Sequence, residues 1–126
     1  MANSAGYHET EEKLPDDVKD NHRALTSMQE ELEAIDWYDQ RVAAATDPDL
    51  KGILAHNRDE EKEHFVMLLE WYRRRDPKMA TELKDRLFTS GSIVAQEQAE
   101  KAGGGGEAAP GAGSLGIGSL KGGQGL

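Results

Sequence analysis

Apolar residues recur at alternating spacings of four and three positions along two long segments of the chain, residues 15–45 and residues 48–75. This spacing keeps the apolar positions on one face of an α-helix, so it predicts two amphipathic helices. Only Thr46 and Asp47 separate the segments, and we expect an antiparallel hairpin. Pro48 suits a first helical position, and Asp47 before it is a good N-cap. The positions predicted to line the seam between the helices are Ala24, Met28, Glu31, Ile35, Tyr38 and Val42 in the first and Leu50, Leu54, Asn57, Glu61, His64, Leu68 and Trp71 in the second.

A shorter helix is predicted after the hairpin, from Pro77 to about Phe88, with Asp76 as its N-cap. Residues 89–92, with the sequence Thr-Ser-Gly-Ser, break the pattern. Residues 93–101 have a helical composition but no obvious apolar stripe. The predicted fold class is all-α, a two-helix antiparallel hairpin plus a short third helix.

Eleven of the 14 glycines fall between Gly103 and Gly125, so the C-terminal part of the chain differs in composition from the rest. We divide the chain into a flexible N-terminal segment (residues 1–14), a helical hairpin domain (residues 15–101) and a glycine-rich, disordered tail (residues 102–126). Without the tail about 100 residues are left, and a domain of that size buries only about 60–65% of its unfolded surface when it folds alone. Self-association is therefore expected.

The charge and the composition exclude several classes of function. The chain has 24 acidic and 15 basic side chains and a net charge of -9, which disfavours nucleic acid and anionic membrane surfaces as partners. It has no cysteine, so disulfides, thiolate metal sites and thiol nucleophiles are excluded. No apolar run approaches the ~20 residues that span a bilayer, and residues 1–13 lack the pattern of a secretory signal. A cytoplasmic protein is expected.

Three ionisable residues interrupt the apolar seam, and they form the candidate site. Glu31 lies in the first helix, and Glu61 and His64 lie one turn apart in the second. Counted from the turn, with a rise of ~1.5 Å per residue, all three fall at nearly the same height in the hairpin. A buried carboxylate needs a partner, so the three residues form either an interhelical polar network or a metal site.

Glu61 and His64 form a Glu-x-x-His pair, which places a carboxylate and an imidazole on one helix face. Ferritin-like di-iron sites combine one Glu from each of two helices with one Glu-x-x-His from each of the other two. This chain supplies one of each, so one hairpin makes half of such a site. Two hairpins related by a two-fold axis would dimerise into a four-helix bundle with two metal ions between them. Carboxylates and imidazole without thiolate suit iron, manganese or zinc.

Three stretches of the chain together resemble the encapsulated ferritins: Glu30-Glu31-Leu32-Glu33 followed by Asp36-Trp37-Tyr38, Asp59-Glu60-Glu61-Lys62-Glu63-His64-Phe65, and the C-terminal Gly113-Ser114-Leu115-Gly116-Ile117-Gly118-Ser119-Leu120-Lys121. The resemblance implies an annular decamer of two-helix protomers with a ferroxidase centre at a protomer interface. It implies that the catalytic residues and ligands of a di-iron (Fe2+/Fe3+) centre are Glu31, Glu61 and His64. It also implies that Trp37 and Tyr38 surround these ligands and that Glu30 and Glu33 lie on the route by which metal reaches them.

The same resemblance implies that residues 113–121 direct the protein into an encapsulin shell. Leu115, Ile117 and Leu120 are the large apolar residues of this peptide and suit an extended segment that binds in a groove. The glycine-rich stretch before them suits a flexible linker. The alternative is that the tail is only a disordered end or a scar of expression.

The function expected from these features is a ferroxidase that oxidises Fe(II) to Fe(III) with O2 and works as cargo of a cytoplasmic encapsulin nanocompartment, for iron mineralisation and storage. Two other functions fit the same residues: a non-enzymatic helical cargo or adaptor protein whose polar seam fixes register, and a di-metal oxidase or peroxidase with another substrate. A DNA-protecting mini-ferritin is disfavoured by the acidic charge. No role is predicted for His8, His22 and His56.

Overall fold

The computed structural model describes residues 6–103, and within them all regular elements are helices. The chain divides into two compact units after Pro77. The first unit contains a short 3-10 helix, η2 (Glu11–Lys13), and the long helices α1 (Asp16–Ala44) and α2 (Pro48–Arg75). The second contains α3 (Pro77–Arg86), which begins at the boundary, and α4 (Ile93–Ala102). The predicted all-α fold is confirmed, with a fourth helix in addition to the three that were expected.

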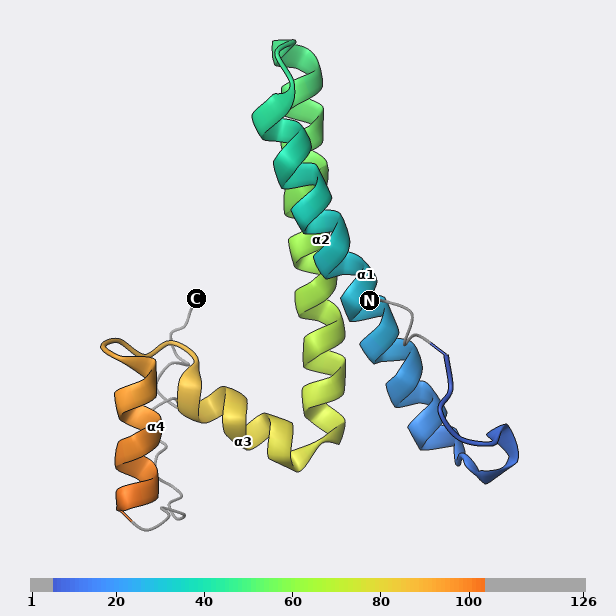
Figure 1. The fold of residues 1–126 in the computed structure, drawn as a ribbon, viewed down its shortest axis with the longest axis vertical. Helices are drawn as coiled ribbons and strands as arrows, with labels where there is room; N and C mark the ends of the chain where they lie inside the picture. The colour runs from blue at the N-terminus through green and yellow to red at the C-terminus, as the bar shows by residue number, and fades with distance from the viewer. Residues whose placement is uncertain (1–5, 104–126) are drawn as a thin grey trace. The chain divides into compact units, whose positions relative to one another are not determined.

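Helices α1 and α2 form the predicted antiparallel hairpin (Figure 1). Helix α2 has the predicted bounds, and α1 is one residue shorter than predicted at each end because Pro15 and Ala45 have extended backbone. The Asp47 side chain accepts a hydrogen bond from the backbone N–H of Leu50 at 2.9 Å, and Pro48 is the first residue of the helix. This bond satisfies one of the N–H groups that the start of a helix leaves without an intrahelical partner.

The residues just before α1 contact its first turns. The ring of Tyr7 packs on the ring of His22, with 4.9 Å between the centroids. The ammonium of Lys19 lies 3.3 Å from a carboxylate oxygen of Glu11, which belongs to η2. These two contacts join η2 and the loop before it to α1.

The hairpin buries very little of its apolar surface. Among the residues that the structure describes, only Ala24 and Met28 are buried, with 6% and 7% of their surface exposed. The other predicted seam positions are half-buried, except Leu50 and His64, which are exposed. Large apolar side chains stay exposed on both helices, among them Leu25, Leu32, Trp37, Ile53, Val66 and Met67. So small a core supports little stability on its own, which favours burial of this surface against a partner.

An ion pair joins the two long helices between the turn of the hairpin and the candidate site. The guanidinium of Arg58 on α2 lies 3.0 Å from the carboxylate of Asp39 on α1 and 3.1 Å from that of its neighbour Asp59. Asp39 follows Glu31 by about two helical turns, and Arg58 precedes Glu61 by about one. The pair therefore helps to set the register of α1 against α2 close to the candidate site.

Helix α3 ends at Arg86, two residues before the predicted end at Phe88. The reason is the backbone of Phe88, whose φ of 59° lies in the left-handed region and cannot continue a right-handed helix. Gly91 follows with a φ of 86°, a conformation that glycine adopts at no steric cost. Together these two residues turn the chain between α3 and α4.

Helix α4 is fixed at both ends by side chains. The Ser92 hydroxyl accepts a hydrogen bond from the backbone N–H of Ala95 at 3.1 Å and caps the start of the helix. The guanidinium of Arg86, the last residue of α3, donates to both carboxylate oxygens of Glu100 at 2.9 and 3.0 Å. None of the helices in the described part of the chain combines the length and the apolar character that crossing a bilayer requires.

Candidate metal centre

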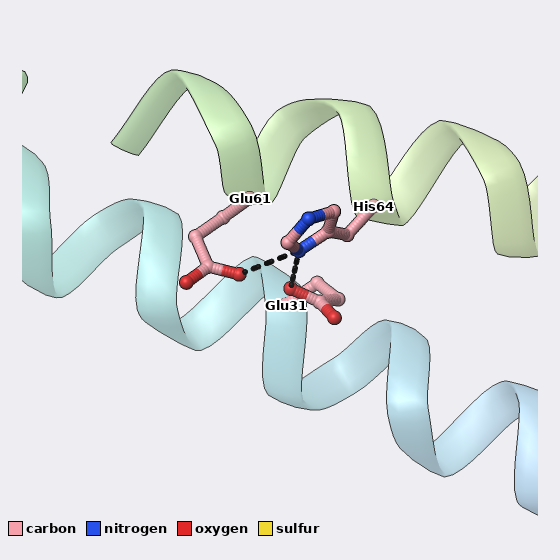
Figure 2. A group of neighbouring side chains, drawn as sticks. All are labelled: Glu31, Glu61 and His64. Carbon is pink, nitrogen blue, oxygen red and sulfur yellow. Dashed lines mark hydrogen bonds and ion pairs between the residues drawn. The ribbon is translucent and has the colours of Figure 1, made fainter. Parts of the chain in front are cut away.

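Three side chains from the two long helices point toward one another in the seam of the hairpin (Figure 2). Glu31 reaches from α1, and Glu61 and His64 reach from successive turns of α2. The Nδ1 atom of His64 lies 3.3 Å from Oε1 of Glu61 and 3.6 Å from Oε1 of Glu31. One ligand atom from each residue lies within 4.8 Å of the other two. A single hairpin therefore brings together the ionisable residues of the seam.

The geometry of this cluster suits a metal ion. Metal–ligand bonds of about 2.1 Å place neighbouring ligand atoms of one ion about 3 Å apart, and the separations of 3.3 and 3.6 Å need only small side-chain movements to reach that value. Two carboxylates and an imidazole without sulfur match the preferences of iron, manganese and zinc. The side chains of Glu31 and Glu61 are 22% and 23% exposed, whereas that of His64 is 46% exposed. The cluster is therefore open to solvent on its imidazole side.

Two groups of the cluster, Glu31 and His64, have shifted pKa values. The pKa of Glu31 is raised, first by its hydrogen bond with Glu61, then by partial burial and by the negative charge of Glu61. Partial burial lowers the pKa of His64, but the hydrogen bond with Glu61 and the charges of the surrounding glutamates outweigh this effect, so the net pKa is raised. The imidazole of His64 and the carboxyl of Glu31 therefore both hold a proton more tightly than usual. A bound cation would replace these protons and relieve the repulsion between the carboxylates.

A further carboxylate, Glu60, lies beside the cluster and was not predicted as a site residue. Its Oε1 atom lies 4.0 Å from Nε2 of His64, and its Oε2 atom lies 3.9 Å from Nε2 of His56. The sequence contains the signal for this arrangement, because His56, Glu60 and His64 follow one another at intervals of four residues and such residues are neighbours on a helix surface. His56, for which no role was predicted, therefore shares a carboxylate with His64.

The two aromatic residues expected around the ligands lie farther along α1. Trp37 is 51% exposed, and the guanidinium carbon of Arg41 lies 5.3 Å from the ring centroid of Tyr38. Tyr38 follows Glu31 by seven positions, which is about 10 Å along a helix. The role of both aromatic residues stays a prediction that depends on a second copy of the chain.

The remaining predicted residues fall outside the cluster. Glu30 and Glu33 are exposed on α1, and their place on a route for metal stays a prediction. The residues of the predicted targeting peptide lie outside the part of the chain that the structure describes: Leu115, Ile117 and Leu120.

An open groove of about 600 Å³ adjoins the candidate centre. Figure 1 shows that the first turns of α1 lie apart from the last turns of α2, and residues from these turns line the groove. Glu31 and His64 are among its lining residues, together with the apolar side chains of Ala24, Met67 and Trp71. The candidate centre thus opens onto a groove with apolar side chains in its lining, of which Met67 is exposed.

A helical hairpin with one glutamate on its first helix and a Glu-x-x-His pair on its second corresponds to half of a ferritin-like di-iron bundle. The all-helical fold is therefore consistent with the ferritin-like class of helical proteins. Comparisons with known proteins narrow this class to a family.

The EncFtn-like family model matches residues 6–90. The chain is 58% identical over 130 residues to an encapsulated ferritin-like protein of Rhodospirillum rubrum, and the alignment covers 97% of this chain and 93% of that protein. It is 47% identical over 92 residues to a ferritin-like protein of Thermotoga maritima, with 73% of this chain and 81% of that protein covered. It is 38% identical over 71 residues to the encapsulin nanocompartment cargo protein EncC of Myxococcus xanthus, with coverage of 52% and 55%.

A solved structure supports the same family assignment as the relatives found by sequence. The crystal structure of a protein from Nitrosomonas europaea is 60% identical and has a TM-score of 0.69, over 71% of this chain and 98% of that chain. The chain therefore belongs to the EncFtn-like family, and the resemblance to the encapsulated ferritins is confirmed.

Proposed function

We propose that the chain is a ferroxidase, which oxidises Fe(II) to Fe(III) with O2 at a di-iron centre built from Glu31, Glu61 and His64 of two copies. The observation that carries the proposal is the convergence of these side chains on one another, at 3.3 and 3.6 Å, as a carboxylate–imidazole set. Iron is the substrate of the reaction, and the three residues bind and orient it.

A second copy of the chain completes the centre in this proposal. One hairpin offers two glutamates and one histidine, whereas a ferritin-like di-iron site takes four glutamates and two histidines. The exposed apolar groove beside Glu31 and His64 supports the pairing, because a two-fold axis near the centre would set groove against groove and bury both. We infer that such pairs assemble further into the annular decamer that the resemblance to encapsulated ferritins implies.

Each residue has a defined task in the proposed reaction. His64 binds Fe(II) through Nδ1, the ring nitrogen that faces both glutamates. Glu31 and Glu61 bind as carboxylates, and one of them holds the two ions close enough to react with the same O2. Two Fe(II) lose one electron each, and O2 takes up both electrons and two protons to form H2O2. The Fe(III) then leaves for mineralisation.

We also propose that the protein works as cargo inside a cytoplasmic encapsulin nanocompartment, in which the oxidised iron is stored. Two relatives have names that state this association, the encapsulated ferritin-like protein and the encapsulin nanocompartment cargo protein. The predicted targeting peptide at residues 113–121 supplies the contact with the shell. Deletion of residues 113–126 should abolish co-purification with a co-expressed shell and leave iron oxidation unchanged. Unchanged loading would contradict this part of the proposal.

Aerobic oxidation of Fe(II) by the purified full-length protein, followed by the absorbance of Fe(III), tests the ferroxidase proposal. The parent protein should oxidise iron faster than buffer does, and Glu61→Ala should oxidise it at the buffer rate. Glu63→Ala removes an exposed carboxylate two residues away and should behave as the parent does. A parent-like rate for Glu61→Ala would overturn the assignment. A parent protein that binds no metal would support a helical adaptor instead.

A further inference from the structure

Helix α2 places two imidazoles on either side of one carboxylate, next to the candidate centre. Glu60 follows His56 by four residues and precedes His64 by four, so the three side chains are neighbours along the helix. One oxygen of Glu60 lies 4.0 Å from Nε2 of His64, and the other lies 3.9 Å from Nε2 of His56. Each carboxylate oxygen therefore has its own imidazole.

The two ring nitrogens of His64 face different carboxylates. Nδ1 lies 3.3 Å from Glu61 and 3.6 Å from Glu31, and Nε2 faces Glu60. A neutral imidazole carries a proton on one nitrogen and a lone pair on the other. Metal binding through Nδ1 needs the lone pair there, so the proton must be on Nε2. Glu61 works against this arrangement in the metal-free protein, because it attracts the ring proton to Nδ1.

We propose that Glu60 is a positioning residue for the centre, which accepts the Nε2–H of His64 and so favours the tautomer whose Nδ1 lone pair faces Glu31 and Glu61. The inference rests on the proposed function, since it states how one ligand of that centre is oriented. Histidines that bind metals usually donate their second ring N–H to a carboxylate, carbonyl or water, which fixes the tautomer and the ring orientation. Nε2 of His56 lies 3.9 Å from the other oxygen of Glu60.

The solvent exposure of Glu60 and His64 determines how much metal affinity the loss of Glu60 should cost. Loss of such a partner typically lowers metal affinity 10- to 100-fold. The side chains of Glu60 and His64 are 48% and 46% exposed, so water replaces part of the lost contact and we expect about a tenfold loss. The separation of 4.0 Å exceeds a hydrogen bond, and a rotation of the half-exposed Glu60 side chain is enough to close it.

Calorimetric titration of the full-length protein with Co2+, a divalent substitute for Fe(II) that is stable in air, measures the affinity of the centre. Glu60→Ala should bind Co2+ about tenfold more weakly than the parent, and Glu60→Gln, which keeps an acceptor oxygen, should recover most of the affinity. Glu63→Ala removes the same charge from an exposed position next to His64 and should bind as the parent does. Equal affinities for Glu60→Ala and Glu63→Ala would overturn the inference.

A second measurement uses the metal-free protein. Nitrogen-15 NMR of the imidazoles, at a pH at which His64 is neutral, reports which ring nitrogen carries the proton. Glu60→Ala should shift the proton of His64 toward Nδ1 relative to the parent, and Glu63→Ala should not. An unchanged tautomer in Glu60→Ala would overturn the inference. A parent protein that binds no Co2+ would instead contradict the proposed function, and the tautomer measurement would still decide the role of Glu60.

Discussion

Met67 provides a direct test of the proposed pairing of two hairpins. Its side chain lines the groove beside Glu31 and His64, and the residue is 62% exposed in a single hairpin. Replacement by alanine should therefore change the fold of one hairpin very little. If a second copy covers the groove, the same replacement removes two apolar side chains from the interface, one from each copy.

The size of this effect can be worked out from the exposed area. Full burial of a methionine side chain contributes about 1.5–3 kcal/mol, and 62% of the residue is still exposed and available for burial. Each copy then loses about 1–2 kcal/mol and the pair about 2–4 kcal/mol. Because every 1.4 kcal/mol is a factor of about ten, the dissociation constant of the pair should rise by about 30-fold to several hundred-fold.

Sedimentation velocity over a range of protein concentrations measures this dissociation constant for the full-length parent and for Met67→Ala, and circular dichroism checks that both are equally helical. Val66→Ala is the matched control, since Val66 is 58% exposed and is not among the residues that line the groove. Parent-like association of Met67→Ala would refute the groove as the pairing surface, and so would an equal loss in both variants.

Three further predictions concern ion pairs of the hairpin and the turn between α3 and α4. Hydrogen bonds from Arg73 and Arg74 lower the pKa of Glu70 to about 2. A carboxyl group whose pKa is lower in the folded than in the unfolded protein stabilises the fold at pH values above its unfolded pKa of about 4.3. This contribution is lost as the pH falls toward 2. Glu70→Gln should therefore lower the unfolding free energy at pH 7 by less than about 1 kcal/mol, since the side chains of Glu70 and Arg73 are each 41% exposed and water screens their pair. Urea unfolding should find that this deficit shrinks below pH 4; a deficit that does not change with pH would contradict the assignment. Phe88→Gly should stabilise the turn between α3 and α4 by about 0.5–1 kcal/mol, because glycine adopts the φ of 59° without strain and the phenyl ring is 87% exposed; hydrogen exchange of the α4 amides measures this, and equal exchange in Phe88→Gly and Phe88→Ala would contradict it. Arg58→Ala should lower the unfolding free energy, and by less when Asp39 is already alanine, because only the pair with the neighbouring Asp59 is then lost; a double-mutant cycle measures the coupling, and additive effects would show that the pair does not join the helices.

Much of the hairpin could be predicted because the residues that begin and end its helices act on their immediate neighbours in the sequence. Pro48 and its cap Asp47 are adjacent in sequence to the turn that they define, and the apolar spacing continues on either side. The end of α3 could not be predicted in the same way. A positive φ is rare for a phenylalanine, so the residue type at Phe88 gives no warning that the helix stops before it.

The candidate site was predictable to the extent that it depends on one chain. Because the rise per residue in a helix is constant, the distance of a residue from the turn follows from the number of residues between them. Glu31 could therefore be expected opposite Glu61 and His64. Glu60 was missed because it lies beside the apolar seam, and a search for interruptions of that seam passes over it. The position of Tyr38 relative to the ligands depends on a second copy, which no spacing within one chain specifies.

Native mass spectrometry of the full-length protein, with and without Fe(II) and in the absence of O2, tests the central claim most directly. The centre requires two copies, so iron should be found on species with an even number of chains, with two ions for each pair of chains. Glu61→Ala should assemble without binding iron. Iron bound to single chains, or an equal iron content in the parent and in Glu61→Ala, would contradict the account.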